Sequence, residues 1–243
     1  MNNFLVTGAA KGLGLAITKS ILNQWEDSAI YGVNRSNSEE YQELMKTYSN
    51  RVFFKAYDLG NVNDLKKDIF KDFLNSKIPL HGFVNNAAYA YDDIVTNLNA
   101  DELEKMYKVN VFSPMMLTKL AIRNMLLHQV KGSIVHISSI SVHTGYKGLA
   151  MYASTKGAME AFSKNTAREW GELGIRSNAL VAGFMETGMS ATLSDSQKDR
   201  IYKRTSLKKE TAKESVADTI SFLLSDAAKS ITGQNIHVDS GTI

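Results

Sequence analysis

The sequence contains no cysteine, only two prolines and no long run of apolar residues. Without cysteine the chain cannot form disulfides, use a thiolate nucleophile or bind a metal through sulfur. Its five histidines show no spacing typical of a metal site, so we expect no bound metal. No segment approaches the roughly 18 apolar residues of a membrane-spanning helix, and no signal-peptide pattern precedes the first strand pattern. These absences predict a cytoplasmic protein that does not bind membranes.

The net charge is also small, at +3, because 28 basic residues are nearly balanced by 25 acidic ones. No basic stripe of the kind that holds a phosphate backbone is present, so we expect no nucleic-acid partner. The cluster Lys203, Arg204, Lys208 and Lys209 is most simply a solvated surface, and docking of a partner is the alternative interpretation.

The 243 residues predict one domain, residues 1–243, because no linker or low-complexity tract divides them. Short β-rich runs alternate with stretches of helical length, which is typical of repeated βαβ units. The runs are residues 4–7, 29–33, 52–57, 82–85, 133–137, 177–181 and 235–238. We therefore predict an α/β protein with a doubly wound Rossmann fold, in which a parallel seven-stranded sheet carries helices on both faces.

Two of the helical stretches, residues 111–127 and 157–170, carry apolar side chains on more than one face. A helix of this kind is buried both by its own sheet and by a second surface. Packing between subunits is the expected second contact, and we predict a homotetramer or a homodimer.

A glycine-rich turn follows the first predicted strand, with Gly8, Gly12 and Gly14 before a helical pattern. Glycines permit close approach of the backbone to a phosphate, and the start of a helix offers free N–H groups. Such a turn can also be only a strand-to-helix connection, but its place after the first strand favours a dinucleotide site.

The residues after the second strand bear on the choice of dinucleotide. An acidic residue there would hold a ribose 2′-hydroxyl, whereas this chain has Asn34, Arg35 and Ser36, with Lys11 in the first turn. Two cations without a carboxylate favour NADP(H) over NAD(H), although both could be plain surface charges. Asp58, at the end of the third strand, could accept a hydrogen bond from an adenine amino group or could cap a helix.

The pair Tyr152 and Lys156 lies four residues apart in a helical pattern, with Ser139 thirteen residues before the tyrosine. This spacing places phenol and ammonium on one helix face, where the cation can favour the phenolate. Chance alone could supply such a pair in a chain with ten tyrosines. The combination with Ser139 and the glycine-rich turn indicates a proton donor for a carbonyl group.

Taken together, these motifs resemble the short-chain dehydrogenase/reductase family over essentially the whole chain. The matching elements are Thr7 to Gly14, Asp58-Leu59, Asn85-Asn86-Ala87, Asn110, Ser139, Tyr152 with Lys156, Ile175-Arg176-x-Asn178, Gly183 to Thr187 and Thr232-Gly233-Gln234. Within the family the chain looks most similar to bacterial 3-oxoacyl-(acyl carrier protein) reductases.

The resemblance implies a catalytic tetrad of Asn110, Ser139, Tyr152 and Lys156. Ser139 would bind the substrate oxygen, Tyr152 would exchange the proton, and Lys156 would lower the tyrosine pKa and hold the nicotinamide ribose. Ser138 is the neighbouring candidate, but the spacing of thirteen favours Ser139. The expected cofactor-binding residues are Gly8, Lys11, Gly12, Leu13, Gly14, Asn34, Arg35, Ser36, Asp58, Leu59, Asn86, Ala87, Tyr152, Lys156, Gly183, Met185 and Thr187.

Asn110 can also be interpreted from its position four residues before Pro114. Because proline has no N–H, the carbonyl of residue 110 loses its α-helical partner, and we expect the helix to be interrupted there. A proline in the first helical turn is the alternative.

Two departures from the family pattern lie beside the predicted cofactor site. Ala88 stands where glycine is usual, and Ala182 stands where proline is usual. We expect residues 183–206 to form a flap over the substrate, with Ser139, His143, Tyr146 and Met189 as substrate contacts.

The substrate stays open between a small molecule and an acyl thioester. Arginines that dock the acidic carrier in the reductases are replaced here by Val130 and Leu173, and Lys131 or Arg168 are possible substitutes. A dehydrogenase of a sugar, a polyol or another small ketone or alcohol fits nearly as well. A regulatory protein that binds nucleotide without turnover is the alternative of another class, but it should have lost Ser139, Tyr152 or Lys156.

Overall fold

A parallel sheet of seven strands forms the centre of the molecule in the computed structural model, which describes residues 1–186 and 194–242. The strands are β1 (Asn2–Thr7), β2 (Ser28–Asn34), β3 (Val52–Ala56), β4 (Gly82–Asn85), β5 (Ser133–Ser139), β6 (Arg176–Ala182) and β7 (Asn235–Val238). Their order is β3-β2-β1-β4-β5-β6-β7, and all neighbours pair in parallel. The predicted fold is confirmed, and each predicted strand overlaps an observed one.

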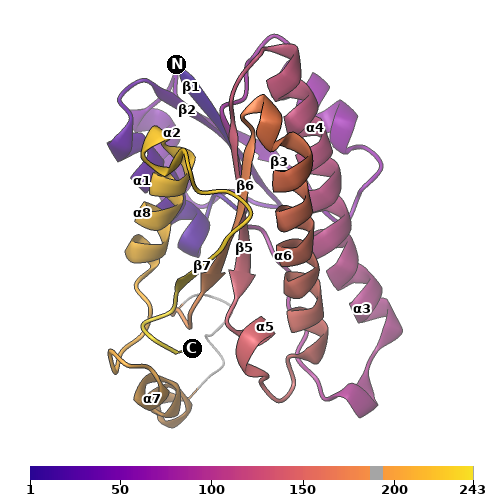
Figure 1. Cartoon of the computed structure of the whole chain (residues 1–243), viewed down its shortest axis with the longest axis vertical. Coiled ribbons are helices and arrows are strands. Elements are labelled where there is room, and N and C mark those ends of the chain that lie inside the picture. The colour runs from indigo at the N-terminus through magenta and orange to yellow at the C-terminus, as the bar shows by residue number, and fades with distance from the viewer. Residues whose placement is uncertain (187–193, 243) are drawn as a thin grey trace.

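Helices cover both faces of the sheet (Figure 1). They are α1 (Gly12–Gln24), α2 (Glu39–Thr47), α3 (Ala100–Tyr107), α4 (Ser113–Leu127), α5 (Ser141–Thr144), α6 (Ala150–Trp170), α7 (Asp195–Arg204) and α8 (Lys213–Leu224). Two π-helical segments, η1 (Lys66–Lys71) and η3 (Lys108–Phe112), and short 3₁₀ segments at Val95–Asn97, Gly171–Leu173 and Asp226–Ala228 complete the set for the described residues.

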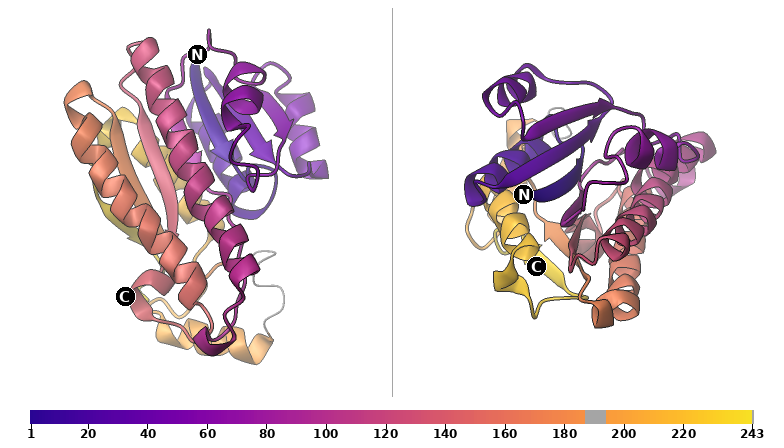
Figure 2. Two further views of the ribbon diagram at one scale, coloured as in Figure 1. Left: turned by 90° about the vertical axis from the view of Figure 1, so that its right-hand side faces the viewer. Right: turned by 90° about the horizontal axis from the view of Figure 1, so that it is seen from above.

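The core has two halves, one on each face of the sheet. Alternate residues of β1 supply both, since Phe4 and Val6 pack with α1, α2 and α8, whereas Leu5 packs with η1 and α4. Strands buried on both faces read as continuous apolar runs, which is why the sequence pattern locates them well. Figure 2 shows α4 and α6 side by side across one face.

The long helical stretch from Ala100 to Leu127 is interrupted as predicted. η3 replaces α-helical bonding by a π-helical turn, in which the N–H of Ser113 donates to the carbonyl of Lys108. Pro114 follows in the first turn of α4, so the proline lies where a missing N–H is tolerated and the irregularity lies just before it.

No described helix is long and apolar enough to cross a membrane. Side chains of α4 that face away from the sheet include two apolar groups with large exposure, Met116 and Leu127. The prediction that this helix meets a second apolar surface is therefore compatible with its exposed face, but the partner stays a prediction.

Candidate active site

A cleft of about 540 Å³ opens at the carboxyl ends of the strands. In open α/β sheets this is where ligands bind, because the connections to the helices leave a crevice there. Most of the predicted cofactor residues line it, namely Gly8, Lys11, Gly12, Leu13, Gly14, Asn34, Arg35, Asp58, Leu59, Asn86, Ala87, Tyr152, Lys156, Gly183 and Met185. Ser36 does not line the cleft, and Thr187 lies outside the described residues.

The turn between β1 and α1 has the form that a phosphate requires. Gly8 and Gly12 have φ angles of +69° and +54°, a region that favours glycine. A Cβ atom on Gly14 would lie 1.9 Å from the carbonyl oxygen of Gly8, so the turn closes too tightly for any side chain there. No side chain caps the N-terminus of α1. The free N–H groups and the positive end of the helix dipole therefore fit a dinucleotide phosphate.

Thr7 and Asn86 tie this turn to the end of β4. The Thr7 hydroxyl accepts hydrogen bonds from the backbone N–H groups of Asn86 and Ala87, each at 3.1 Å. In return the Asn86 amide donates to the carbonyls of Thr7 and Gly8 at 3.0 and 3.2 Å. The glycine turn thus has a defined position relative to the neighbouring strand.

The residues after β2 and β3 form the other end of the cleft. Lys11 and Arg35 are exposed cleft-lining side chains, and neither has an ion-pair partner within residues 1–186 and 194–242. Asp58 accepts a hydrogen bond from the N–H of Gly60 at 2.9 Å. It does not cap η1, which begins after Leu65, so the capping alternative is wrong.

Ser139, Tyr152 and Lys156 meet at the end of β5 and the start of α6, and all three line the cleft. The Lys156 ammonium is buried, donates to the carbonyl of Ile137 at 2.7 Å and lies 5.6 Å from the centre of the Tyr152 ring. The Ser139 hydroxyl oxygen accepts hydrogen bonds from the N–H and the hydroxyl of Ser141, at 3.2 and 3.0 Å. With both acceptor positions used, the Ser139 proton is free to donate to a ligand.

Burial dominates the protonation of this cluster. It raises the pKa of the Tyr152 hydroxyl, and the carboxylate of Asp92 adds to the rise. Burial also lowers the pKa of the Lys156 ammonium to about 8. In this structure the Lys156 ammonium donates to the Ile137 carbonyl, and burial dominates the Tyr152 pKa, so the lowering expected from Lys156 stays a prediction. Tyr152 carries its proton at neutral pH.

Asn110 does not line the cleft, but it supports two walls of it. Its buried side-chain oxygen accepts from the N–H of Tyr89 at 2.8 Å, and its amide donates to the carbonyl of the same residue at 2.8 Å. The amide also donates to the Thr155 hydroxyl at 3.1 Å, on the helix of the tyrosine and lysine. These three bonds connect the loop after β4, η3 and α6.

The predicted substrate contacts are only partly brought together. Ser139 lines the cleft, whereas His143 and Tyr146 do not line its described part, so those two substrate contacts stay predictions. His143 instead contacts the carboxylate of Glu160 at 3.1 Å, and its ring centre lies 5.0 Å from that of His237. Met189 lies outside the described residues.

Sequence reasoning missed Lys105 as a cleft residue. It lines the cleft, and its ammonium lies 4.1 Å from the centre of the Tyr89 ring. The Tyr89 hydroxyl donates to the Glu102 carboxylate at 2.6 Å. Lys105 lies on α3 and belongs to no motif of the sequence, so no local signal pointed to it. Within the described residues no group of histidine and acidic side chains could hold a metal ion.

A family model described as Enoyl-(Acyl carrier protein) reductase matches residues 8–242. The chain belongs to the short-chain dehydrogenase/reductase family. Members of this family are NAD(P)-dependent oxidoreductases that act on CH–OH and C=O groups, so the predicted enzyme class is confirmed.

Individual relatives within the family agree with this membership. The chain is 31% identical to a 3-oxoacyl-[acyl-carrier-protein] reductase of Chlamydia pneumoniae, covering 98% of this chain and 95% of the relative. It is 30% identical to the corresponding reductase of Aquifex aeolicus with the same coverage. The predicted resemblance to this group of reductases is confirmed.

Solved structures of short-chain dehydrogenases share the fold. A 4-hydroxyisoleucine dehydrogenase complexed with NADH superposes with a TM-score of 0.92 at 24% identity, over 100% of this chain and 98% of that one. The 2-deoxy-d-gluconate 3-dehydrogenase from Agrobacterium tumefaciens, described as putative and bound to NADP, gives 0.90 at 22% identity, over 99% and 96%. At these identities the likeness concerns the fold alone.

Proposed function

We propose that this protein is an NADP(H)-dependent reductase of a 3-oxoacyl thioester carried by an acidic carrier protein. The observation that carries the proposal is the arrangement of Ser139, Tyr152 and Lys156 at the floor of a dinucleotide cleft. The names of the relatives that span the whole chain support the substrate class. All members of the tetrad are retained, which argues against a nucleotide-binding protein without turnover.

In the proposed reaction, a bound nicotinamide supplies the hydride that reduces the substrate carbonyl. The Ser139 hydroxyl donates a hydrogen bond to the substrate oxygen, since its own oxygen is already occupied by Ser141. Tyr152, protonated because burial raises its pKa, donates the proton that the new alcohol needs. Lys156 retains two ammonium protons beyond the one given to Ile137, and these can bind the nicotinamide ribose.

The preference for NADP(H) over NAD(H) is supported by Lys11 and Arg35. Both are exposed in the cleft where a 2′-phosphate would lie, and residues 34–36 at the end of β2 contain no carboxylate to bind a free ribose hydroxyl. Arginine binds phosphate through charge-assisted hydrogen bonds, which favours the phosphorylated cofactor.

A basic surface beside the cleft supports an acidic carrier. Residues 200–213 contain six basic side chains and one acidic one, whereas the rest of the chain contains 22 and 24. The positive net charge thus lies at α7 and the segment after it, beyond the carboxyl ends of the strands (Figure 1). The exposed members are Arg200, Lys203, Arg204, Lys208 and Lys209. This surface would replace the absent arginines, whose places hold the partly buried Val130 and the exposed Leu173.

We further propose a cytoplasmic homotetramer in which residues 183–206 cover the substrate. Exposed apolar side chains support the assembly, among them Phe112 and Met116 before and within α4 and Phe222 on α8. Light scattering of the purified protein measures the subunit number, and a monomer would contradict this assembly. Part of the proposed flap lies outside the described residues.

Replacement of Tyr152 by phenylalanine tests the chemistry. NADPH oxidation with acyl carrier thioesters, free small ketones and sugars should be detectable for the wild type with the thioester. It should collapse in Tyr152→Phe by a factor on the order of 10² to 10⁴, with nucleotide binding retained. Unchanged turnover in this variant would refute Tyr152 as the acid.

The same substrate panel separates the proposed substrate from its alternative. A higher kcat/KM with sugars or polyols than with thioesters would show that the substrate is a small molecule and not a carrier-bound thioester. Lys203→Glu combined with Arg204→Glu should raise KM for the carrier thioester on the order of tenfold, without affecting a small ketone. Lys66→Glu with Lys67→Glu, also exposed, is the control of equal charge.

A further inference from the structure

Glu160 is a buried carboxylate that the reaction does not use directly. It lies on α6 four residues after Lys156 and eight after Tyr152, so the three side chains follow one face of the helix. Its side chain is 8% exposed and is not among the residues that line the described cleft. A buried carboxylate needs hydrogen-bond donors around it, and Glu160 has them from three other elements.

The donors come from β5, α5 and β7. One carboxylate oxygen accepts from the hydroxyl of Ser138 and from the Nε2 atom of His143, the latter at 3.1 Å. The other accepts from the side-chain amide of Asn235 at 2.7 Å. A carboxylate can accept all three bonds, and the contact with His143 requires the proton on Nε2.

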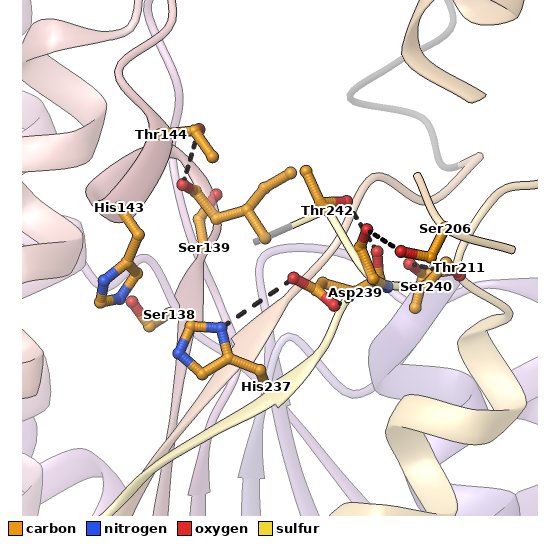
Figure 3. A network of polar contacts seen from close by, with 12 residues as sticks. Ser138, Ser139, His143, Thr144, Ser206, Thr211, His237, Asp239, Ser240 and Thr242 are labelled. Carbon is orange, nitrogen blue, oxygen red and sulfur yellow. Dashed lines mark hydrogen bonds and ion pairs between the residues drawn. The ribbon is translucent and has the colours of Figure 1, made fainter. Parts of the chain in front are cut away.

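These contacts lie on both sides of the catalytic serine. Ser138 precedes Ser139 at the end of β5, and His143 belongs to the helical turn whose first residue, Ser141, donates twice to the Ser139 oxygen. Figure 3 shows Ser138, Ser139 and His143 close together at the end of this strand. Glu160 therefore holds the residue before Ser139 and the turn after it through a single carboxylate.

α6 carries Tyr152 and Lys156 as well as Glu160. The contacts of Glu160 with Ser138 and His143 therefore fix the position of Ser139 relative to Tyr152, the proton donor. On the other side, Asn235 begins β7, where His237 lies beside His143 and 4.0 Å from the carboxylate of Asp239 (Figure 3). Among the described residues, His143 is the titratable group that contacts Glu160, and His143 in turn lies beside His237.

We propose that Glu160 is a positioning residue that sets the Ser139 hydroxyl relative to the Tyr152 hydroxyl by holding Ser138 and His143. This role rests on the proposed reductase function, because the two hydroxyls must reach one substrate oxygen. Small displacements of such groups reduce turnover strongly, whereas the glycine turn and Arg35, which also line the cleft, belong to other elements with which Glu160 makes no hydrogen bond among the described residues. His143, predicted as a substrate contact, acts here as a link between α6 and the serine.

Glu160→Gln is the sharpest substitution, since it conserves size and leaves one acceptor oxygen in place of two. Its amide nitrogen must face either the Asn235 amide or the donors Ser138 and His143, so one set of bonds is lost or must reverse its direction. We expect kcat to fall by about 10- to 100-fold, with NADPH affinity unchanged. Glu169→Gln, exposed on the same helix, is the matched control and should behave as the wild type.

A double-substitution cycle and hydrogen exchange distinguish positioning from general loss of stability. Ser138→Ala should lower kcat in the same direction, and its combination with Glu160→Gln should cost less than the product of the two effects. Amide exchange in residues 138–144 should accelerate in Glu160→Gln but not in Glu169→Gln. Unchanged kcat, unchanged exchange in this segment, or multiplicative effects would each overturn the proposal.

The outcome also separates this proposal from the function on which it rests. If the wild type reduces no thioester, ketone or sugar, the reductase function fails. The exchange measurement still decides whether Glu160 holds the segment around Ser139, and faster exchange in Glu160→Gln alone would support that role. Faster exchange throughout the protein would instead indicate global destabilisation and would overturn it.

Discussion

Replacement of Lys156 by methionine should raise the free energy of unfolding above that of the wild type at neutral pH, and it should abolish turnover. Methionine fills a similar volume, so the buried site stays packed. Lys156 is 3% exposed, and burial lowers its pKa to about 8 from the ordinary value of 10.5. The wild type thus keeps a buried charge at a position where an uncharged side chain would give a more stable folded state. Active sites often carry a stability cost of this kind.

The size of the effect follows from the two pKa values. The unfolded chain binds a proton at Lys156 up to about pH 10.5, whereas the folded chain binds it only up to about pH 8. Between these values the unfolded state holds more protons, so the free energy of unfolding of the wild type rises with pH. The burial cost is about 3 kcal/mol at pH 7, where it is fully present, and about 2 to 3 kcal/mol of it disappears by pH 10. The pKa of about 8 already includes the bond to Ile137, so loss of this bond in the variant offsets part of the gain by about 1 to 2 kcal/mol independently of pH.

Urea unfolding of both proteins from pH 7 to pH 10 measures this directly. The free energy of unfolding of Lys156→Met minus that of the wild type should fall by about 2 to 3 kcal/mol across this range. The titration of all other groups cancels in the difference to first order. A difference that stays constant within about 1 kcal/mol would refute the assigned burial of the charge, because linkage requires the change.

Two further predictions concern the cofactor cleft. Gly14→Ala should abolish NADPH binding or prevent folding, because its Cβ would lie 1.9 Å from the Gly8 carbonyl, whereas Gly157→Ala meets only Val142 at 3.5 Å. The second variant should be stabilised by up to about 1 kcal/mol, and equal behaviour of the two in a titration and a melt would contradict the tight turn. Arg35→Asp should lower the ratio of kcat/KM for NADPH to that for NADH by about 10- to 100-fold, and an unchanged ratio would remove Arg35 from the phosphate site.

The sequence predicted the features whose causes are local. Strand β1 was located because a parallel strand buried on both faces contains a continuous apolar run, here Phe4 to Val6, and its observed bounds differ by two residues. The glycine turn was located because Gly8 and Gly14 serve a backbone geometry that no other residue fits. Tyr152 and Lys156 were paired because their spacing is that of one helical face.

Features that depend on distant segments were missed. The contact of His143 with Glu160 was missed because the two residues lie seventeen positions apart on different elements, so no local pattern relates them. The direction of the Tyr152 pKa depends on burial by the whole fold, which spacing does not describe. A signal for Glu160 did exist, because an acidic residue continued the face of Tyr152 and Lys156 on an otherwise buried stretch of helix.

The cleft draws its lining from Gly8 at the start of the chain to Met185 after the sixth strand. Its walls are therefore distant in sequence and come together only when the central strands have taken their places in the sheet. A truncated chain or a partly assembled sheet has no complete binding surface, so nucleotide affinity reports on the whole fold. Because only the complete fold binds the nucleotide, a bound cofactor would stabilise the folded protein in a cell and so reduce its proteolysis.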